Sequence, residues 1–149
     1  MRQIYTRLFI GSQEDCFAGA GGWCVVHACR HPCYTWAASH TAQSTPTNTE
    51  NDLYLDLIDP PVPLFEPAPF LDFLAFADRH WKEGASLLVH CNCGLSRAPS
   101  LALLFLAKRR EAIAAESYAA ARSAFEKLLP AYAPGEGIRR FLTDRWMEL

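Results

Sequence analysis

Blocks of hydrophobic and polar residues along the chain predict strands in its first two thirds. Leu8–Gly11 is a short apolar block that ends in a turn. Trp23–Cys29 is an almost continuous apolar run with two adjacent valines, which is typical of a strand buried on both faces. The alternating segment Leu53–Ile58 and the apolar segment Ser86–His90 predict two more strands.

Helical spacing of apolar residues predicts the remaining elements. A short helix capped by a serine is expected first, then one whose apolar residues follow i, i+3, i+4, i+7 spacing, then three consecutive helices. We expect a long surface loop over residues 34–52, which are rich in Thr, Ser, Asn and Ala. The expected helices are Gln13–Phe17, Pro69–Trp81, Ala98–Arg110, Ala112–Leu129 and Gly137–Met147.

This order of elements indicates the fold class. Strands that alternate with helices predict an α/β protein with a central, mostly parallel sheet flanked by helices. The consecutive helices at the end predict an all-helical C-terminal part. The chain has 149 residues, which predicts a single domain over residues 1–149.

Composition narrows the classes of partner. Fourteen basic and sixteen acidic residues give a net charge of −2, which argues against nucleic acid or an anionic membrane as the main partner. The charged start lacks the pattern of a secretory signal, and the longest apolar stretch, Leu101–Ala107, is too short to span a membrane. We therefore expect a soluble, cytoplasmic protein, with no cofactor and no metal.

The segment from Val89 to Ser100 carries the candidate chemistry. It follows a buried strand and opens a long helix, so its backbone N–H groups converge near the positive end of the helix dipole. Cys91 stands at its start, where the dipole and Arg97 favour the thiolate. Arg97 matches two oxygens of a phosphate, and Gly94 lets the backbone approach the anion. The pattern indicates an oxyanion cradle above an activated cysteine nucleophile.

The same residues resemble a known signature. His90, Cys91, Gly94 and Arg97 resemble the HCxxGxxR motif of the cysteine-dependent protein tyrosine phosphatases, and the run from His90 to Ser100 resembles the dual-specificity subgroup. The resemblance implies a phosphotyrosine-phosphatase-like fold and hydrolysis of phosphate monoesters through a phosphocysteine. It implies phosphotyrosine, and also phosphoserine or phosphothreonine, in a protein or a small phosphate monoester. The phosphate-binding loop would comprise Asn92, Cys93, Gly94, Leu95, Ser96 and Arg97.

The reaction also needs a proton for the leaving oxygen, which a carboxylic acid on a facing loop supplies in this family. Asp52, Asp56 and Asp59 are the upstream candidates. Asp56 lies within a predicted strand and Asp52 precedes it, whereas Asp59 follows the end at which open α/β sheets place their sites. We therefore expect Asp59 to act as general acid and then as general base. The alternative is that Asp59 only begins a turn before Pro60.

Two residues of the motif are expected to support the nucleophile. The resemblance implies that His90 orients the loop and favours ionisation of Cys91. Ser96 can hydrogen-bond the loop backbone or the thiolate, although a plain loop serine is nearly as good an interpretation.

Ala98 departs from the family pattern. The residue after the arginine is usually Ser or Thr, and its hydroxyl is thought to stabilise the thiolate that leaves during hydrolysis of the phosphocysteine. Ala98 therefore favours slow turnover, and it leaves open a second hypothesis, a phosphate-binding pseudophosphatase that acts as an interaction module. A sulfur or arsenate enzyme related to rhodanese is a weaker alternative, because such enzymes lack the upstream Asp loop and the long helical C-terminus.

The cysteines suggest one further hypothesis and weaken another. The segment from His27 to His31 resembles the place where some relatives keep a cysteine that forms a disulfide with the oxidised nucleophile, which makes Cys29 the expected redox partner of Cys91 and Cys33 the second choice. A buried core thiol is the alternative for Cys29. A zinc site among the clustered cysteines and histidines of residues 24–33 is disfavoured, because no pair has CxxC spacing.

Overall fold

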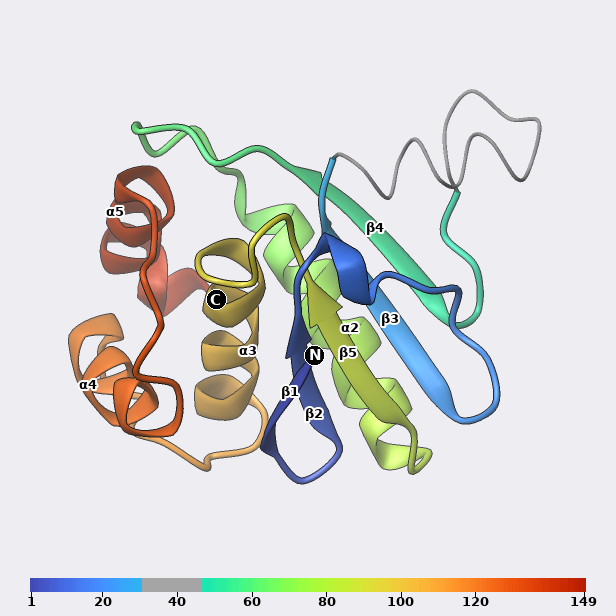
Figure 1. Ribbon diagram of the computed structural model, residues 1–149. Coiled ribbons are helices and arrows are strands. Elements are labelled where there is room, and N and C mark those ends of the chain that lie inside the picture. Colours follow the sequence, from blue (N-terminus) through green and yellow to red (C-terminus); the bar gives the residue numbers. More distant parts are fainter. Residues whose placement is uncertain (31–46) are drawn as a thin grey trace.

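The computed structural model describes residues 1–30 and 47–149, and in that part the chain forms a five-stranded sheet with the order β1-β2-β5-β3-β4 (Figure 1). Strands β2, β5, β3 and β4 run parallel, and β1 pairs antiparallel with β2. The sheet is therefore mostly parallel, as predicted. The strands are β1 (Arg2–Tyr5), β2 (Leu8–Gly11), β3 (Trp23–Cys29), β4 (Asp52–Leu57) and β5 (Ser86–His90).

The strand predictions hold with two differences. β2, β3 and β5 have the predicted bounds, whereas β4 begins one residue earlier and ends one residue earlier than expected. β1 was not predicted, because it is an exposed strand at the sheet edge and lacks an apolar run. The parallel strands all end at the same edge of the sheet, and the loops that follow β4 and β5 start there.

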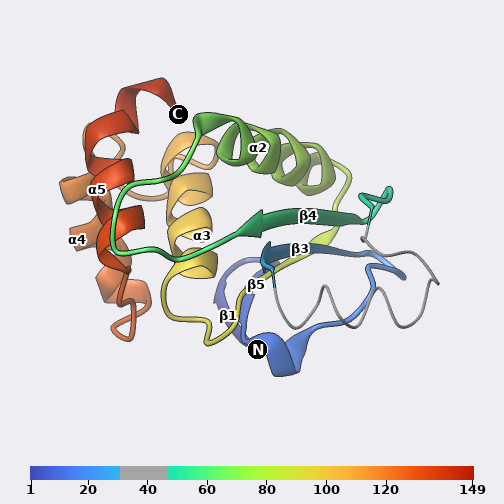
Figure 2. The ribbon, with the colours of Figure 1, turned by 90° about the horizontal axis from the view of Figure 1, so that it is seen from above.

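The helices form an inner layer, next to the strands, and an outer layer beyond it (Figures 1 and 2). α2 and α3 contact each other and the strands, and α4 and α5 lie outside α3. An all-helical C-terminal part is thereby confirmed. The helices are α2 (Pro67–Lys82), α3 (Arg97–Lys108), α4 (Tyr118–Leu128) and α5 (Glu136–Arg145), with 3-10 turns η1 (Gln13–Asp15) and η2 (Trp146–Glu148).

The predicted helix over 112–129 is wrong in its first six residues. α4 begins only after Ser117, whose hydroxyl caps it by accepting from the Ala120 N–H. Before that point the backbone carbonyl of Ala115 accepts a hydrogen bond from the indole of Trp146. The segment between α3 and α4 is therefore held as a loop by a residue that lies far along the chain. The predicted short helix after Ser12 is also reduced to the single turn η1, with Ser12 as its cap.

α3 is the central element of the core. Residues from Ala98 to Leu106 are fully buried, and Phe73 of α2 packs its ring 6.3 Å from that of Phe105. A helix surrounded by apolar side chains on all sides is fixed in position, so the loop that leads into its first turn is fixed as well. The helices of the described part are all too short or too polar to cross a membrane.

Candidate active site

The loop between β5 and α3 is tied to the end of the neighbouring strand β2. Cys91 begins the loop, is 2 % exposed, and donates its backbone N–H to the carbonyl of Gly11 at 3.3 Å. The N–H of Gln13 donates to the carbonyl of Asn92 at 3.1 Å. These bonds hold the start of the loop, where the buried Cys91 lies, against β2.

Gly94 shows why the loop needs a glycine. Its φ angle of +69° lies in the left-handed region, and a Cβ atom there would come within 3.0 Å of the Gly11 carbonyl. The close approach that the structure shows at Gly94 is therefore to the Gly11 backbone of β2, whereas the expected approach to an anion stays a prediction.

Arg97 lies where the loop becomes α3. Its side chain is almost fully buried, and Nη1 donates to the carbonyl of Leu57 at 2.7 Å. Its Nε is also buried and donates to no group in the described residues. Nε lies 3.8 Å from Oδ2 of Asp59, so the guanidinium stands between the end of β4 and this carboxylate.

Of the three candidate acids, the structure brings Asp59 to Arg97. Asp59 lies on the loop after β4, and its side chain is 25 % exposed, so it is open to solvent. The side chain of Asp56 is 45 % exposed and pairs with Arg30 at 3.3 Å. Asp52 is buried and contacts His27 at 3.1 Å. The geometry thus separates the three carboxylates, and Asp52 belongs to β4 itself instead of preceding it.

The start of α5 completes the surroundings of Asp59, which the sequence did not predict. The N–H of Gly135 donates to Oγ of Ser96 at 2.9 Å, and a Cβ atom on Gly135 would lie 2.5 Å from Oδ1 of Asp59. Gly137 similarly lies directly against the backbone carbonyls of Pro60 and Val62. Two glycines at the start of a C-terminal helix were the available signal, but only the fold shows what they approach.

The hydroxyl groups near Ala98 are engaged elsewhere. Ala98 is fully buried in the first turn of α3. Oγ of Ser100, two residues later, bonds to the hydroxyl of Tyr132 at 2.9 Å, and Tyr132 bonds in turn to Tyr118 at 3.0 Å. Burial raises the pKa of Tyr132 well above its ordinary value, so this chain of hydroxyls stays uncharged. The Ser96 hydroxyl accepts a hydrogen bond from the Gly135 N–H, so it can still donate one hydrogen bond through its own proton.

His90 ends β5 beside a second buried histidine. Its Nε2 lies 2.9 Å from Nδ1 of His27, and Nε2 of His27 lies 3.1 Å from Oδ1 of Asp52. Burial, with the positive charge of His27 as a second cause, lowers the pKa of His90 to about 3. His90 is therefore the neutral member of the pair, and its Nδ1 is buried without a hydrogen-bond partner in the described residues.

Only one group of described side chains has the spacing of metal ligands. Sγ of Cys16, Nδ1 of His27 and Nε2 of His90 lie within 4.8 Å of one another. The two nitrogen atoms are already within hydrogen-bond distance of each other, and we therefore assign this group to a hydrogen-bond chain and not to a metal. Cys24, which belonged to the disfavoured zinc cluster, instead contacts Asn51.

The proposed redox cysteine lies at the end of the strand next to β5. Cys29 is the last residue of β3 and is 3 % exposed, and β3 pairs in parallel with β5, whose last residue is His90. This places Cys29 beside the strand that leads into Cys91. Cys33, the second choice, lies outside the described residues.

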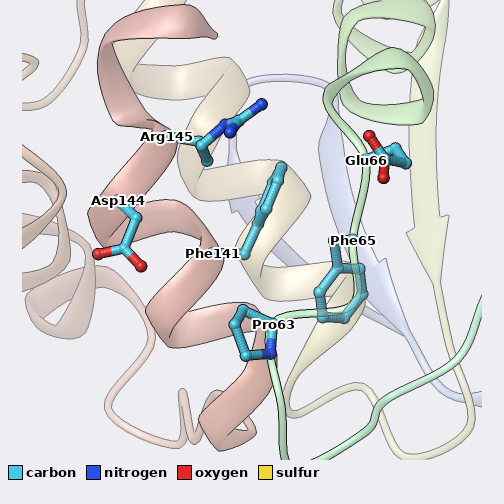
Figure 3. A pocket seen from close by; sticks show the side chains of 6 residues that line it. All are labelled: Pro63, Phe65, Glu66, Phe141, Asp144 and Arg145. Carbon is cyan, nitrogen blue, oxygen red and sulfur yellow. The ribbon is translucent and has the colours of Figure 1, made fainter.

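A cavity of about 340 Å³ lies between α5 and the segment before α2 (Figure 3). The rings of Phe65 and Phe141 are 5.7 Å apart in its wall. Its other lining residues are Pro63, Glu66, Asp144 and Arg145. It contains none of the residues that the sequence predicted for the reaction, so we place the site at the Cys91 loop and not in this cavity.

Comparison with known proteins supports this fold. The sequence matches no family model and no curated protein sequence. Solved structures do match across nearly the whole chain. Human DUSP28 is 21% identical, covers 98% of this chain and 94% of its own, and has a TM-score of 0.68.

Two further solved structures also match nearly the whole of this chain. The human tyrosine phosphatase-like serine/threonine/tyrosine-interacting protein is 20% identical with a TM-score of 0.70, over 98% of this chain and 95% of that one. OH1 from the Orf virus, described as a tyrosine phosphatase with triple substrate specificity, is 18% identical with a TM-score of 0.64, over 98% of this chain and 86% of that one. The chain therefore has the fold of the dual-specificity phosphatases.

Proposed function

We propose that the protein is a phosphatase that hydrolyses phosphate monoesters, in a protein or a small molecule, through a phosphocysteine on Cys91. In this proposal Arg97 and the backbone N–H groups of residues 92–97 hold the phosphate. Asp59 acts as general acid and base. His90 and Ser96 support the nucleophile.

One observation carries the proposal above all others. Asp59, from the loop after β4, lies 3.8 Å from Arg97, from the loop after β5. A phosphate held by the guanidinium is thereby flanked by a carboxyl group, while the buried Cys91 begins the loop that ends at Arg97. Nucleophile, anion cradle and proton donor are three parts of one reaction, and chance placement of a lone Cys and Arg would not supply the third.

The reaction runs in two steps. The Cys91 thiolate attacks phosphorus and the ester oxygen departs, taking the proton of the protonated Asp59 carboxyl group. The Asp59 carboxylate then removes a proton from water, whose oxygen attacks phosphorus, and the S–P bond breaks to return the thiolate and free phosphate. Arg97 binds two phosphate oxygens in both steps through its planar guanidinium.

The test is steady-state hydrolysis of phenyl phosphate by matched variants. Cys91→Ser is expected to abolish turnover and to keep phosphate-ester binding. Asp59→Asn is expected to lower kcat roughly 10²–10⁴-fold, the usual contribution of general acid catalysis. Asp56→Asn is the control, because it makes the same change of charge on an exposed side chain three residues away. An equal loss in Asp56→Asn, or full activity in Cys91→Ser, would overturn the proposal.

A second candidate function is a phosphate-binding module with little turnover. Ala98 favours it, because that position lacks the usual hydroxyl and Ser100 is already bonded to Tyr132. A single-turnover experiment separates the two functions. A phosphatase releases one equivalent of phenol rapidly even when the second step is slow, whereas a binding module holds the ester intact.

A further inference from the structure

The buried polar chain behind the Cys91 loop runs through three strands. Asp52 begins β4, His27 lies in β3 and His90 ends β5, and all three side chains are at least nine-tenths buried. The contacts along it are 3.1 Å and 2.9 Å. A buried charged or polar chain costs free energy unless its members satisfy one another, so the arrangement of protons along it is restricted.

Asp52 determines that arrangement, because its environment fits the ionised form. Its carboxyl group accepts from the N–H of Gly19 at 2.8 Å and from the hydroxyl of Thr49 at 2.9 Å, in addition to its contact with His27. These hydrogen bonds outweigh the effect of burial and lower the pKa of Asp52. A carboxylate is only an acceptor, so Nε2 of His27 must carry a proton.

The second nitrogen of His27 then faces a neutral ring. Burial holds the pKa of His90 near 3, so His90 carries one proton and not two. With Asp52 ionised on one side and His90 neutral on the other, a positive charge on this chain is more favourable on His27 than on His90. Its Nδ1 then donates to Nε2 of His90, which leaves the single proton of His90 on Nδ1.

We propose that Asp52 and His27 are positioning residues for Cys91. The carboxylate of Asp52 keeps both ring nitrogens of His27 protonated, and this imidazolium fixes one tautomer of His90 and places a buried positive charge behind the loop. The charge favours the thiolate of Cys91, and the fixed tautomer holds His90, the residue that precedes it, in a single hydrogen-bonded arrangement. The inference rests on the proposed role of Cys91 as nucleophile, but it concerns residues outside the signature motif.

Among residues 1–30 and 47–149, the other groups that face His27 do not replace Asp52. Tyr54 of β4 stacks on the ring at 4.1 Å, and Sγ of Cys16 lies 3.6 Å from Nδ1. Asp15 is the acidic group of η1 that favours protonation of His90, and its own carboxylate is bound to the N-terminal amine. Among the described residues, Asp52 is thus the carboxylate in direct contact with the chain.

The first test examines the wild-type protein and needs no variant. In ¹⁵N-histidine-labelled protein at pH 7, imidazole correlation spectra are expected to show both nitrogens of His27 protonated, and His90 neutral with its proton on Nδ1. A neutral His27 at pH 7, or a His90 protonated on Nε2, overturns the inference.

The second test measures the thiol and not turnover. Alkylation of Cys91 by iodoacetamide is measured from pH 4 to 9. Peptide mass spectrometry follows the peptide that contains Cys91, so that cysteines in other peptides do not contribute. Asp52→Asn is expected to move the midpoint of alkylation upward by about one pH unit, a tenfold loss of rate at lower pH. Asp56→Asn, on the same strand with the same change of charge, is expected to leave the midpoint unchanged. Equal midpoints in both variants overturn the inference.

His27→Gln supplies a second route if Asp52→Asn does not fold. Glutamine keeps a donor and an acceptor but carries no charge, so the same upward shift is expected. The two proposals fail differently. A shift in alkylation without hydrolysis of any ester refutes the phosphatase and keeps the positioning role, whereas hydrolysis with unchanged alkylation refutes only the positioning role.

Discussion

Substituting Gly135 with alanine tests the placement of Asp59, the proposed general acid, without changing Asp59 itself. A Cβ atom at Gly135 would lie 2.5 Å from Oδ1 of Asp59, whereas ordinary contact begins at 3.4 Å. Asp59 must therefore retreat by about 0.9 Å, and a misplacement near 1 Å costs roughly 10²-fold in rate. The backbone of Gly135 has φ −58° and ψ 154°, which alanine adopts without strain, so the fold is expected to remain intact.

The assay compares two esters that differ in leaving group. With phenyl phosphate, whose phenoxide needs a proton, Gly135→Ala is expected to lower kcat/KM, which reports the first step, roughly 10²-fold. With 4-nitrophenyl phosphate, whose leaving group is stable without a proton, the loss is expected to be much smaller. Thermal unfolding of the variant, followed by circular dichroism, checks that its stability is unchanged.

A double substitution decides whether the loss passes through Asp59. If it does, adding Gly135→Ala to Asp59→Asn lowers the rate little further, because the acid is already absent. Fully multiplicative losses, or equal losses on the two esters, would refute the reasoning from Gly135.

Three other predictions concern the loop and its cysteine. Arg97→Lys keeps the charge but loses the planar fork and the bond to Leu57, so kcat/KM is expected to fall at least tenfold in steady-state assays. Ala98→Ser supplies the missing hydrogen-bond donor to the leaving thiolate. Because a charge-assisted hydrogen bond contributes about 1.5–3 kcal/mol, kcat is expected to rise about tenfold or more. The rapid initial release of phenol, seen by rapid mixing when the second step is slow, is expected to become smaller. Mild peroxide is expected to join Cys91 to Cys29, which peptide mapping detects; Cys29→Ser should then give irreversible overoxidation of Cys91, and the same products in wild type and variant would contradict the pairing.

Local patterns were sufficient for most of the fold. The bounds of β3 and β5 follow from apolar runs of strand length, and the order of strands and helices gave the mostly parallel sheet. The exposed edge strand β1 has no such signal, because pairing with β2 and not burial maintains it. The false start of the helix at 112 has the same origin. Ala and Ile there suit a helix. However, the Trp146 indole bonds to the Ala115 carbonyl, and the Ser117 hydroxyl caps α4 at its start, so these residues form a loop and the helix begins only after Ser117.

The candidate site divides in the same way. Cys91, Gly94 and Arg97 lie on one contiguous loop, so a motif could identify them. The meeting of Asp59 with Arg97 followed from the rule that parallel strands end at one edge. The contact of Gly135 with Ser96, which is 39 residues away, and the chain from Asp52 to His90 depend on how distant elements pack, and single-sequence patterns contain no record of that packing.

The position of Gly135 at the start of α5 also indicates which residues of this protein are suitable for a mutant library and which are not. Gly135 has no room for a side chain, so a library that varies this position would mostly produce variants with a displaced acid. Ile58, Val62, Leu64 and Leu95 are exposed apolar residues on the two loops that carry Asp59 and Arg97. Substitutions at these four positions change exposed side chains on the same loops without replacing the proposed reacting groups, so a search for new substrate preferences is best directed there.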